Sequence, residues 1–565
     1  MFRTHTCGEL RKEHENKKVI LSGWIDKIRT HGALTFIDLR DRYGITQITL
    51  NKNLESDVRR ESVIKVEGVV KLKPEPNKNL ETGEIEIEAD NFEVLSKSKP
   101  LPLDENATED TKLQYRYLDL RNQKLQENLK VRSDVVFHIR NFFHETGFLE
   151  IETPLLVRST PEGARDFLVP SRINKGKFYA LPQSPQLYKQ ILMIAGMDKY
   201  YQIARCLRDE DLRADRQPEH TQLDLEMSFV SSDEIREHVE KMLYYVFKKV
   251  KNIGIETPFP TFSYKDAMEK YGSDKPDIRF NMFLNNLTEV AKKIDFNVFK
   301  EAEEIYTIFV EKDFSRKEIE EYTELVKIYK AKGLPYVKIK NNEFESGISK
   351  FLNEELKNKL IEISNKKEGT FFFSADRKKI AQLCLGHLRN QIAKDLKLTN
   401  PTDFKFCWVK DFPLFAFNEE ENRWEPEHHV FSMPNSEFVD NFEKNPEKVT
   451  GNLWDLVMNG WEMSSGSIRV SNPEIQKRLF KFIGLSEEEA NEKFGFLIEA
   501  YKYGAPVHGG MGIGIDRLVS LMQQTTDIRD VIAFPKNKNA QCPMDGSPND
   551  VDEIQLKELH IKKNF

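Results

Sequence analysis

Arginines and carboxylates are crowded into one short segment of the chain. The segment 205–226 lies between two apolar runs, 200–204 and 223–229, and contains four arginines: Arg205, Arg208, Arg213 and Arg216. An arginine side chain is always charged and offers paired donors, so it suits a phosphate, while nearby carboxylates can hold the arginine or bind Mg²⁺. The apolar runs predict two strands joined by a long charged loop. A solvated surface loop is the alternative interpretation, which charges enclosed between apolar strands make less favourable.

A second candidate is a glycine-rich segment that leads to an arginine. Residues 504–518 alternate glycine with apolar residues and then reach Arg517. They predict a strand that another group can approach closely, followed by a helix. The segment is neither a Walker loop, because the Lys-Ser/Thr ending is missing, nor a dinucleotide fingerprint, because the Gly-x-Gly-x-x-Gly spacing fails. We therefore expect Arg517 beside a flat surface the size of a nucleotide.

Two acids and an arginine follow each other at intervals of seven residues. Asp455, Glu462 and Arg469 could form a Mg²⁺ site beside a clamp for a carboxylate. On spacing alone, two unrelated surface acids are the better interpretation. The pair His428-His429 lacks the His-Glu-x-x-His spacing of a zinc site, and the five cysteines contain no Cys-x-x-Cys pair, so we expect no zinc.

The elements that must position these groups fall into an α+β multidomain arrangement. Residues 1–95 hold five short β-rich runs and predict a five-stranded OB-fold β-barrel. Through Lys73 this part carries 15 Lys/Arg against 10 Asp/Glu, which suits a polyanionic partner or simply a solvated surface. The apolar periodicity from Val131 to Phe142 predicts an amphipathic helix. The part rich in Lys, Glu and Asn, 275–405, is expected to be a self-contained α+β insertion.

Composition excludes several classes of protein. With 565 residues, of which 39% are apolar and 31% charged, the chain has the balance of a soluble, globular, multidomain protein. No apolar run approaches the roughly 20 residues of a membrane span, and the N-terminus lacks the apolar core of a signal peptide. Scattered cysteines suggest a reducing, cytoplasmic location. The net charge of −7 excludes a uniformly basic nucleic-acid coat.

The order of the segments resembles the three motifs of class II aminoacyl-tRNA synthetases. Gly147-Phe148 with Pro154 is similar to motif 1, Arg208-Asp209-Glu210 to motif 2, and the run from Gly510 to Arg517 to motif 3. The N-terminal barrel, the insertion between motifs 2 and 3 and several longer segments resemble bacterial-type aspartyl-tRNA synthetases over essentially the whole chain: 159–166, 183–189, 211–219 and 551–553. This resemblance implies an antiparallel-sheet catalytic domain of the class II type. The parts we expect are an OB-fold anticodon-binding domain, a hinge, a first catalytic part, the insertion, a second catalytic part and a C-terminal extension: 1–105, 106–130, 131–274, 275–405, 406–545 and 546–565.

The family activity is the adenylation of L-aspartate by ATP and the transfer of aspartyl to the 3′ end of tRNA(Asp), with AMP and diphosphate released. Such chemistry needs positioning and charge neutralisation rather than a protein nucleophile, which agrees with the arginines and acids found. The resemblance implies catalytic roles for Arg208 and Arg517 and a Mg²⁺ ion, bound with ATP, on Asp455 and Glu462. It implies contacts with ATP from nine residues: Arg208, Asp209, Glu210, Gln217, Glu462, Gly514, Ile515, Asp516 and Arg517. It also implies a homodimer built through motif 1, without membrane contact.

An aspartate pocket should offer fixed cations to the side-chain carboxylate. The resemblance gives this role to Arg469 with Lys189 beside it, and completes the pocket with five more residues: Glu162, Gln186, Arg208, Asp224 and His428. Asparagine is nearly isosteric but neutral, so it would leave a buried cation unpaired at a cost of several kcal/mol.

For tRNA, the matching family residues that stack on and read the anticodon are Phe36, Gln47 and Glu86. Without the resemblance, Phe36 could equally be a core residue. His31 stands where a Leu is common in tRNA(Asp)-specific forms and resembles forms that also charge tRNA(Asn), so both acceptors stay open. Two alternative functions also stay open: an asparaginyl-tRNA synthetase and a non-catalytic tRNA-binding paralogue.

Overall fold

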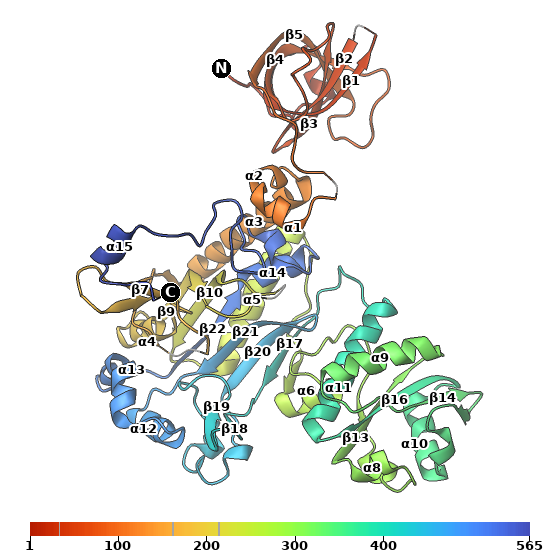
Figure 1. Ribbon diagram of the computed structural model, residues 1–565, viewed down its shortest axis with the longest axis vertical. Coiled ribbons are helices and arrows are strands. Elements are labelled where there is room, and N and C mark those ends of the chain that lie inside the picture. Colours follow the sequence, from red (N-terminus) through yellow and green to blue (C-terminus); the bar gives the residue numbers. More distant parts are fainter. Residues whose placement is uncertain (33, 105, 161–162, 213–214, 565) are drawn as a thin grey trace. The chain divides into compact units, whose positions relative to one another are not determined.

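The computed structural model describes residues 1–32, 34–104, 106–160, 163–212 and 215–564 (Figure 1). The chain divides into two compact units, each described here by itself. The first comprises Met1–Gln126 with Pro543–Asp545, and the second Glu127–Cys542 with Gly546–Phe565. None of the helices in the described part of the chain is both long and apolar enough to cross a membrane.

The first unit is built on a closed barrel of five strands in the order β1-β2-β3-β5-β4. Their bounds are Lys18–His31, Leu34–Asp41, Gly44–Leu50, Val63–Leu72 and Ile85–Ser96. Side chains alternate between the barrel interior and its outer surface, so that Ile37, Leu39 and Ile48 are fully buried in its core. The OB-type barrel predicted from the sequence is confirmed. Two short helices follow it, α1 (Glu109–Gln114) and α2 (Arg116–Asp119).

The second unit contains an eight-stranded sheet in the order β11-β17-β20-β21-β22-β10-β9-β6 (Figure 1). The strand bounds, in that order, are Thr261–Ser263, Phe406–Lys410, Leu453–Met458, Trp461–Ile468, His508–Gly514, Glu219–Ser228, Lys199–Leu207 and Leu149–Glu150. The six central strands are antiparallel, as predicted, whereas the outermost pair at each edge is parallel. The first part of the sheet and the last part are separated in sequence by the insertion, and the antiparallel pairing of β10 with β22 joins them.

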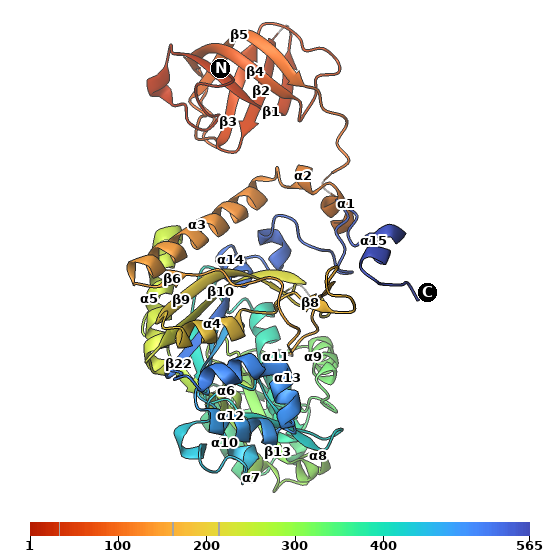
Figure 2. The same ribbon diagram turned by 90° about the vertical axis from the view of Figure 1, so that its left-hand side faces the viewer.

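Helices cover both faces of this sheet. On one face α3 (Gln123–Glu145), α5 (Ser232–Lys251) and α14 (Ile515–Met522) pack on a core that includes Leu223, Leu225 and Met511. On the other face lies α4 (Gln186–Ile194), and Figure 2 shows α3 and α4 on opposite sides of β9 and β10. The helices α12 (Pro473–Phe482) and α13 (Glu487–Tyr501) belong with α4 to a second core. This unit also contains two short hairpins, β7–β8 (Leu168–Pro170, Phe178–Ala180) and β18–β19 (Phe415–Asn418, Arg423–Pro426). It further contains the helices α6 (Tyr264–Tyr271) and α15 (Glu553–Glu558).

The inserted range has a sheet of its own. Five strands in the order β12-β13-β16-β14-β15 (Asn285–Asn286, Glu304–Val310, Glu368–Asp376, Tyr336–Lys340, Glu343–Glu345) pair with one another and with no strand of the large sheet. The helices of this range are α7 (Thr288–Ala291), α8 (Asn297–Glu301), α9 (Arg316–Ile328), α10 (Glu354–Ser364) and α11 (Lys378–Asp395). A separate α+β insertion is therefore present, while the limits given above for each part remain predictions.

Candidate active site

Strand alternation places the acidic side chains of β10 on one face of the large sheet. In β10, Leu223 and Leu225 point into the core shared with α3 and α5, so Asp224 and Glu226 must point to the opposite face. The register places Gly512 opposite Asp224, and Gly510 opposite Glu226. This face is the one that α4 covers.

The glycines of β22 are required by the side chains of β10. A Cβ built on Gly510 would lie well inside 3.0 Å of the carbonyl of Leu225 and the carboxylate of Glu226. A Cβ on Gly512 would overlap the amide of Gln222 in the same way. The predicted close approach to the glycine-rich strand therefore takes place, and side chains of the neighbouring strand lie across it.

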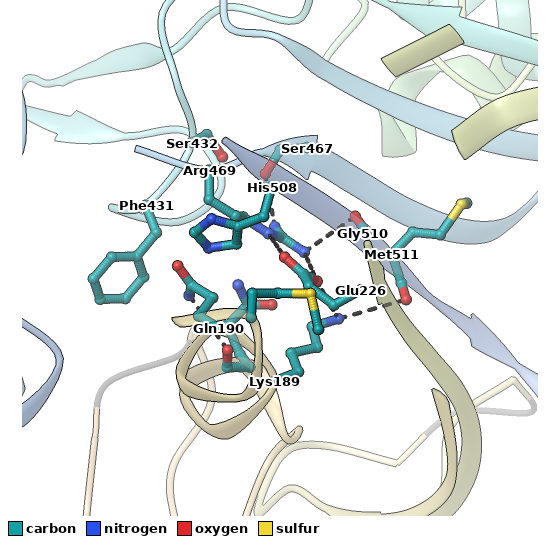
Figure 3. Close-up of polar contacts among 12 residues, drawn as sticks. Lys189, Gln190, Glu226, Phe431, Ser432, Ser467, Arg469, His508, Gly510 and Met511 are labelled. Atoms are coloured by element: carbon teal, nitrogen blue, oxygen red, sulfur yellow. Dashed lines mark hydrogen bonds and ion pairs between the residues drawn. The ribbon is translucent and has the colours of Figure 1, made fainter. Parts of the chain in front are cut away.

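A buried ion network occupies this face (Figure 3). Arg469 binds the carboxylate of Glu226 with two parallel hydrogen bonds, Nε to Oε1 at 2.8 Å and Nη2 to Oε2 at 3.1 Å. The ammonium of Lys189, on α4, lies 3.4 Å from Glu226 and 3.0 Å from Asp224. All four residues are at most 3% exposed. The sequence prediction that Arg469 and Lys189 lie side by side is consistent with this geometry.

Arg469 has a protein partner at each of its nitrogens. Besides Glu226, Nη2 donates to the carbonyl of Gly510 at 3.0 Å, and Nη1 lies 2.7 Å from Ser467 Oγ and 3.2 Å from His429 Nε2. Burial lowers the pKa of His429 well below its ordinary value and Arg469 adds to this effect, so the imidazole is neutral. Nη1 therefore donates to two neutral acceptors, Ser467 and His429, whereas Nε donates to the buried carboxylate of Glu226.

The charges of the pocket leave an excess of one. Lys189 and Arg469 pair with the carboxylates of Asp224 and Glu226, and the charge of Arg208 also acts on Asp224, so three cations stand against two carboxylates. Burial favours the neutral form of Glu226, but Arg469 and Lys189 outweigh it and hold its pKa below the ordinary value. For Asp224 burial dominates over the attraction of Lys189 and raises the pKa. One oxygen of Asp224, Oδ2, is buried without a hydrogen-bond partner among the described residues.

Arg208 stands where β9 ends and the charged loop begins. The predicted hairpin is present, because β9 and β10 pair from Leu207 and Glu219 inward. The Arg208 backbone N–H donates to Pro218 O at 2.8 Å, while the side-chain Nε is buried and has no partner within the described chain. Its charge reaches His220, whose pKa falls to about 4, chiefly through burial and then through Arg208. Arg208 is thus a half-buried cation with an unused donor on the same face as Asp224.

Arg517 lies on α14, one turn beyond Gly514 and Ile515. It donates to the carbonyl of Glu462 and lies 3.4 Å from Asp215. Gly514 pairs with Gln222 near the start of β10, and Leu207 pairs with Glu219 there, so Arg517 and Arg208 stand at the same end of the sheet. The structure therefore places Arg208 after the end of β9 and Arg517 after the end of β22, on either side of β10.

Three of the residues predicted to contact ATP take part in hydrogen bonds with backbone groups of the protein: Gln217, Asp516 and Asp209. Gln217 exchanges two hydrogen bonds with the backbone of Lys536, at 3.1 and 2.8 Å. Asp516 is 3% exposed, forms an ion pair with Arg132 of α3 and accepts from Thr221 N at 2.7 Å. The N–H of Asp209 donates to Arg165 O at 3.0 Å. Glu210 pairs with Arg216 at 2.8 Å within the loop. The predicted contacts of these residues with ATP stay predictions.

Asp455 and Glu462 share one face of the hairpin β20–β21, because a bulge between Leu456 and Val457 restores their alignment. Asp455 is only 3% exposed, which does not fit the interpretation of two unrelated surface acids. Burial and then Glu462 raise the pKa of Asp455 well above its ordinary value. Glu462 pairs with Lys275 at 2.8 Å. Lys275 outweighs burial and lowers the pKa of Glu462. Two neighbouring carboxylates suit Mg²⁺, which takes one or two protein carboxylates together with substrate phosphates. Among the described residues no group of three or more His, Cys, Asp or Glu is arranged as a metal site.

The remaining residues predicted for the pocket have different surroundings, and their roles stay predictions. Gln186, on the same helix as Lys189, has an Nε2 that is buried and unpartnered among the residues described. His428 is exposed, with its ring edge-on to Phe412 at 5.1 Å between centroids. Glu162 lies outside the described residues.

Two of the three predicted anticodon residues, Gln47 and Glu86, contact each other on the outer surface of the barrel. Gln47 Nε2 donates to Glu86 at 2.8 Å, and Lys73 donates to Gln47 at 3.2 Å. Phe36 is half-buried on β2 and is absent from the cluster of buried residues that forms the barrel core. A core role for Phe36 is therefore excluded. His31 is exposed at the end of β1.

Sequence reasoning missed Glu226, the residue that joins both pocket cations. Ser467 and His429 were missed as well. A signal for Glu226 was present: it follows Asp224 by two residues in a predicted strand, so both share a face. No pattern in the sequence indicated that Ser467 and His429 lie at Arg469, because that depends on how distant loops pack.

Comparisons with known proteins agree with this arrangement. Residues 108–538 match the model of tRNA synthetases class II (D, K and N), and residues 19–95 match that of the OB-fold nucleic acid binding domain. Similar curated proteins are named aspartate–tRNA(Asp/Asn) ligase: one from Treponema denticola is 50% identical, and one from Caldanaerobacter subterraneus 49%. These alignments cover 99% of this chain and 99% and 98% of the relatives.

Solved structures give the same fold. A crystal structure of asparaginyl-tRNA synthetase from Pyrococcus horikoshii, complexed with asparaginyl-adenylate, has a TM-score of 0.60 at 20% identity. The superposition covers 95% of this chain and 98% of that chain. The aspartyl tRNA synthetase from Entamoeba histolytica has a TM-score of 0.58 at 18% identity, covering 94% and 91%. At such identities these likenesses concern the fold alone. The family model matches most of the chain, and relatives are about 50% identical to it over 99% of its length. These two findings show that this chain belongs to the class II (D, K and N) tRNA synthetases.

Proposed function

We propose that this protein is an aspartate–tRNA ligase, which activates L-aspartate with ATP and transfers the aspartyl group to the 3′ end of tRNA(Asp). The observation that carries the proposal is the buried pair Arg469 and Lys189, on the same sheet face as Arg208. Together with Arg208, this pair leaves one positive charge in excess over the carboxylates of Asp224 and Glu226. Free aspartate carries two carboxylates and one ammonium group, so its net charge is complementary; asparagine is neutral overall.

The two ends of the substrate would meet different groups. Asp224, with an unpartnered oxygen, suits the ammonium group, as does Glu162 by the family resemblance. Gln186 and His428 would complete the pocket. The side-chain carboxylate would be held by Arg469 and Lys189. Because Glu226 takes the Nε side of Arg469, the substrate would use the Nη1 side, where Ser467 and His429 now accept. Exchange of a neutral acceptor for a carboxylate is favoured, because hydrogen bonds between charged partners are stronger.

Adenylation would be assisted by charge and position. The aspartate α-carboxylate attacks the α-phosphate in line, and Arg208, with its unused Nε, neutralises the charge that develops there. Arg517 would bind the γ-phosphate side, and Glu210 the adenine. Mg²⁺, held by Asp455 and Glu462, would supply charge neutralisation of the diphosphate leaving group. The ATP contacts of Asp209, Gln217, Gly514, Ile515 and Asp516 belong to the same proposal.

The barrel would bind the anticodon of tRNA through Phe36, Gln47 and Glu86. The relatives named for both tRNA(Asp) and tRNA(Asn), together with His31, support tRNA(Asn) as a second acceptor. Assembly as a homodimer through motif 1 completes the proposal. An asparaginyl-tRNA synthetase is less well supported, because a neutral side chain would leave the excess cation of the pocket unpaired. A non-catalytic paralogue is less well supported because Arg208, Glu462 and Arg517 are all present.

Two assays test the proposal. ATP–pyrophosphate exchange with a panel of amino acids should respond to aspartate and not to asparagine, and Arg469→Ala should abolish it. Arg469→Lys keeps the charge but loses the paired geometry, so it should raise the KM for aspartate while ATP binding persists. Charging of purified tRNA(Asp) and tRNA(Asn) in parallel then identifies the acceptor. Exchange that depends on asparagine, or no exchange at all, would overturn the proposal.

A further inference from the structure

A short hairpin in the second unit exposes both cations and large apolar groups. Strands β7 and β8 enclose the loop 171–177, and the whole hairpin, from Leu168 to Ala180, contains Arg172, Lys175 and Lys177 but no Asp or Glu. The three cations are exposed, and no ion pair is found for them within the described part of the chain. An unbalanced group of cations is unexpected in a chain whose net charge is −7.

The same hairpin exposes large apolar side chains. Ile173 is 82% exposed and Phe178 51%, and Tyr179 is exposed as well. Single exposed apolar residues are ordinary, but three on one hairpin that also carries three unpaired cations indicate a surface with a partner. Aromatic rings among cations are what single-stranded nucleic acid binds, because bases stack on the rings while phosphates pair with the cations.

The loop is held in a defined shape. The N–H of Ser171 donates to Lys177 O at 2.9 Å, and the N–H of Lys177 donates to Asn174 O at 3.0 Å. The side chain of Ser171 accepts from Asn174 N at 3.1 Å. Gly176 adopts a positive φ of 73°, with open space around it. The side chains therefore project from a backbone that is already ordered, which lowers the entropic cost of binding.

The position of the hairpin relates it to the chemistry. Directly after β8, the carbonyl of Pro182 accepts from Leu207 N at 2.9 Å, and Leu207 precedes Arg208. The segment before β7 is joined to the charged loop too, through the bridge between Arg165 and Asp209. Figure 2 shows β8 near the end of β9. The base of the hairpin is thus joined to the end of β9, directly before the arginine assigned to the α-phosphate.

We propose that the β7–β8 hairpin binds the unpaired 3′ end of the tRNA, with Lys175 and Lys177 on its phosphates and Phe178 against a base. This inference rests on the proposed function, since it names the surface that would guide the acceptor end toward the aspartyl-adenylate. An acidic protein or a second copy of this chain would be a different partner, and the experiment separates these cases.

The test compares Lys175→Gln/Lys177→Gln with a matched pair of lysines, Lys248→Gln/Lys249→Gln. The control lysines are exposed at the end of α5, on the opposite face of the sheet. Each phosphate contact with a single strand contributes about 0.7 to the slope of log affinity against log salt, so losing two should reduce the slope by about 1.4. Between about 50 and about 200 mM salt, the wild-type protein should then lose about sevenfold more tRNA affinity than the hairpin variant. The control variant should keep the wild-type slope.

Phe178→Ala gives a second, salt-independent readout. Loss of a stacked base should weaken tRNA binding about fivefold or more at every salt concentration, and Phe178→Tyr should restore it. Aspartate-dependent pyrophosphate exchange, measured without tRNA, should stay at the wild-type level in all variants. Exchange that is absent from the wild-type protein would refute the proposed function itself.

With exchange intact, an unchanged salt slope in the lysine variant would overturn the hairpin proposal alone. So would a change in sedimentation mass without a change in slope, because it would identify the hairpin as a contact between copies of the chain.

Discussion

Replacing Gly510 by alanine should damage the aspartate pocket while sparing the ATP side. The added Cβ would overlap the Leu225 carbonyl, which is part of a central strand, and the carboxylate of Glu226. The carboxylate is the group that has to move, yet Arg469 and Lys189 hold it. Overpacking of this kind costs about 1–3 kcal/mol of stability. Loss of one hydrogen bond between the charged partners would cost the pocket about 1.5–3 kcal/mol more.

The assay is pyrophosphate exchange with aspartate and ATP varied separately. Because about 1.4 kcal/mol corresponds to a factor of ten, the KM for aspartate should rise about tenfold to 150-fold, with the KM for ATP nearly unchanged. Gly514→Ala is the complementary variant: the nearest atoms to its Cβ lie 3.8 and 3.9 Å away, so the fold tolerates it. If ATP lies against this glycine, only the KM for ATP should rise.

Gly495→Ala controls for the substitution itself. Gly495 lies within α13, the nearest atom to its added Cβ is at 3.9 Å, and alanine should stabilise the helix by about 0.5–1 kcal/mol without kinetic effect. Wild-type aspartate KM in Gly510→Ala would refute the reasoning that Glu226 positions Arg469. An equal rise in both KM values would show general damage to the sheet rather than to the pocket.

Three more predictions concern separate parts of the protein. Burial raises the pKa of Asp224, so the carboxylate loses its charge at a pH above the ordinary pKa of about 4. The KM for aspartate should therefore rise as the pH falls toward that raised pKa. Asp224→Asn should raise the KM at every pH and flatten this dependence, which a pH series of exchange rates measures. Glu462→Gln should increase the Mg²⁺ concentration needed for half-maximal exchange, which a Mg²⁺ titration measures, and an unchanged requirement would argue against the assigned ligand. Phe36→Ala should weaken tRNA binding about 5-fold to 150-fold, the equivalent of one stacked base, while exchange without tRNA stays normal.

Local patterns were sufficient to predict the barrel and the order of the motifs. The strands of the barrel alternate apolar and polar residues with a period of two, and Gly, Asp and Pro mark their ends, so each strand is specified by its own residues. The helix predicted from Val131 is part of α3, which begins earlier, at Gln123. Its first turns are mostly polar and therefore lie outside the apolar periodicity on which the prediction was based. Helix and strand ends depend on tertiary packing and are less well specified by sequence.

The pocket was predicted only in part, because its geometry depends on strand register. Asp455 and Glu462 share a face only through a bulge, which their spacing of seven residues does not indicate. Glu226 acquires its role because β22 lies next to β10, a pairing between residues nearly 300 positions apart in sequence. The protein partners of Arg469 come from β10, β21, β22 and the loop that holds His429, so no single segment could have predicted them.

A pocket for an acidic amino acid has to keep its cations buried when no substrate is bound. An isolated buried charge costs several kcal/mol, so Lys189 and Arg469 need partners of their own. Glu226 provides a permanent one for both cations, and Gly510 provides the room for it. The exchangeable positions are the neutral ones, at Nη1. A substrate carboxylate can replace a neutral acceptor there with a gain in energy, whereas the amide of asparagine offers no more than the acceptor already in place. In the proposed pocket, discrimination against asparagine would come from which partners Arg469 can exchange, and not from the mere presence of an arginine.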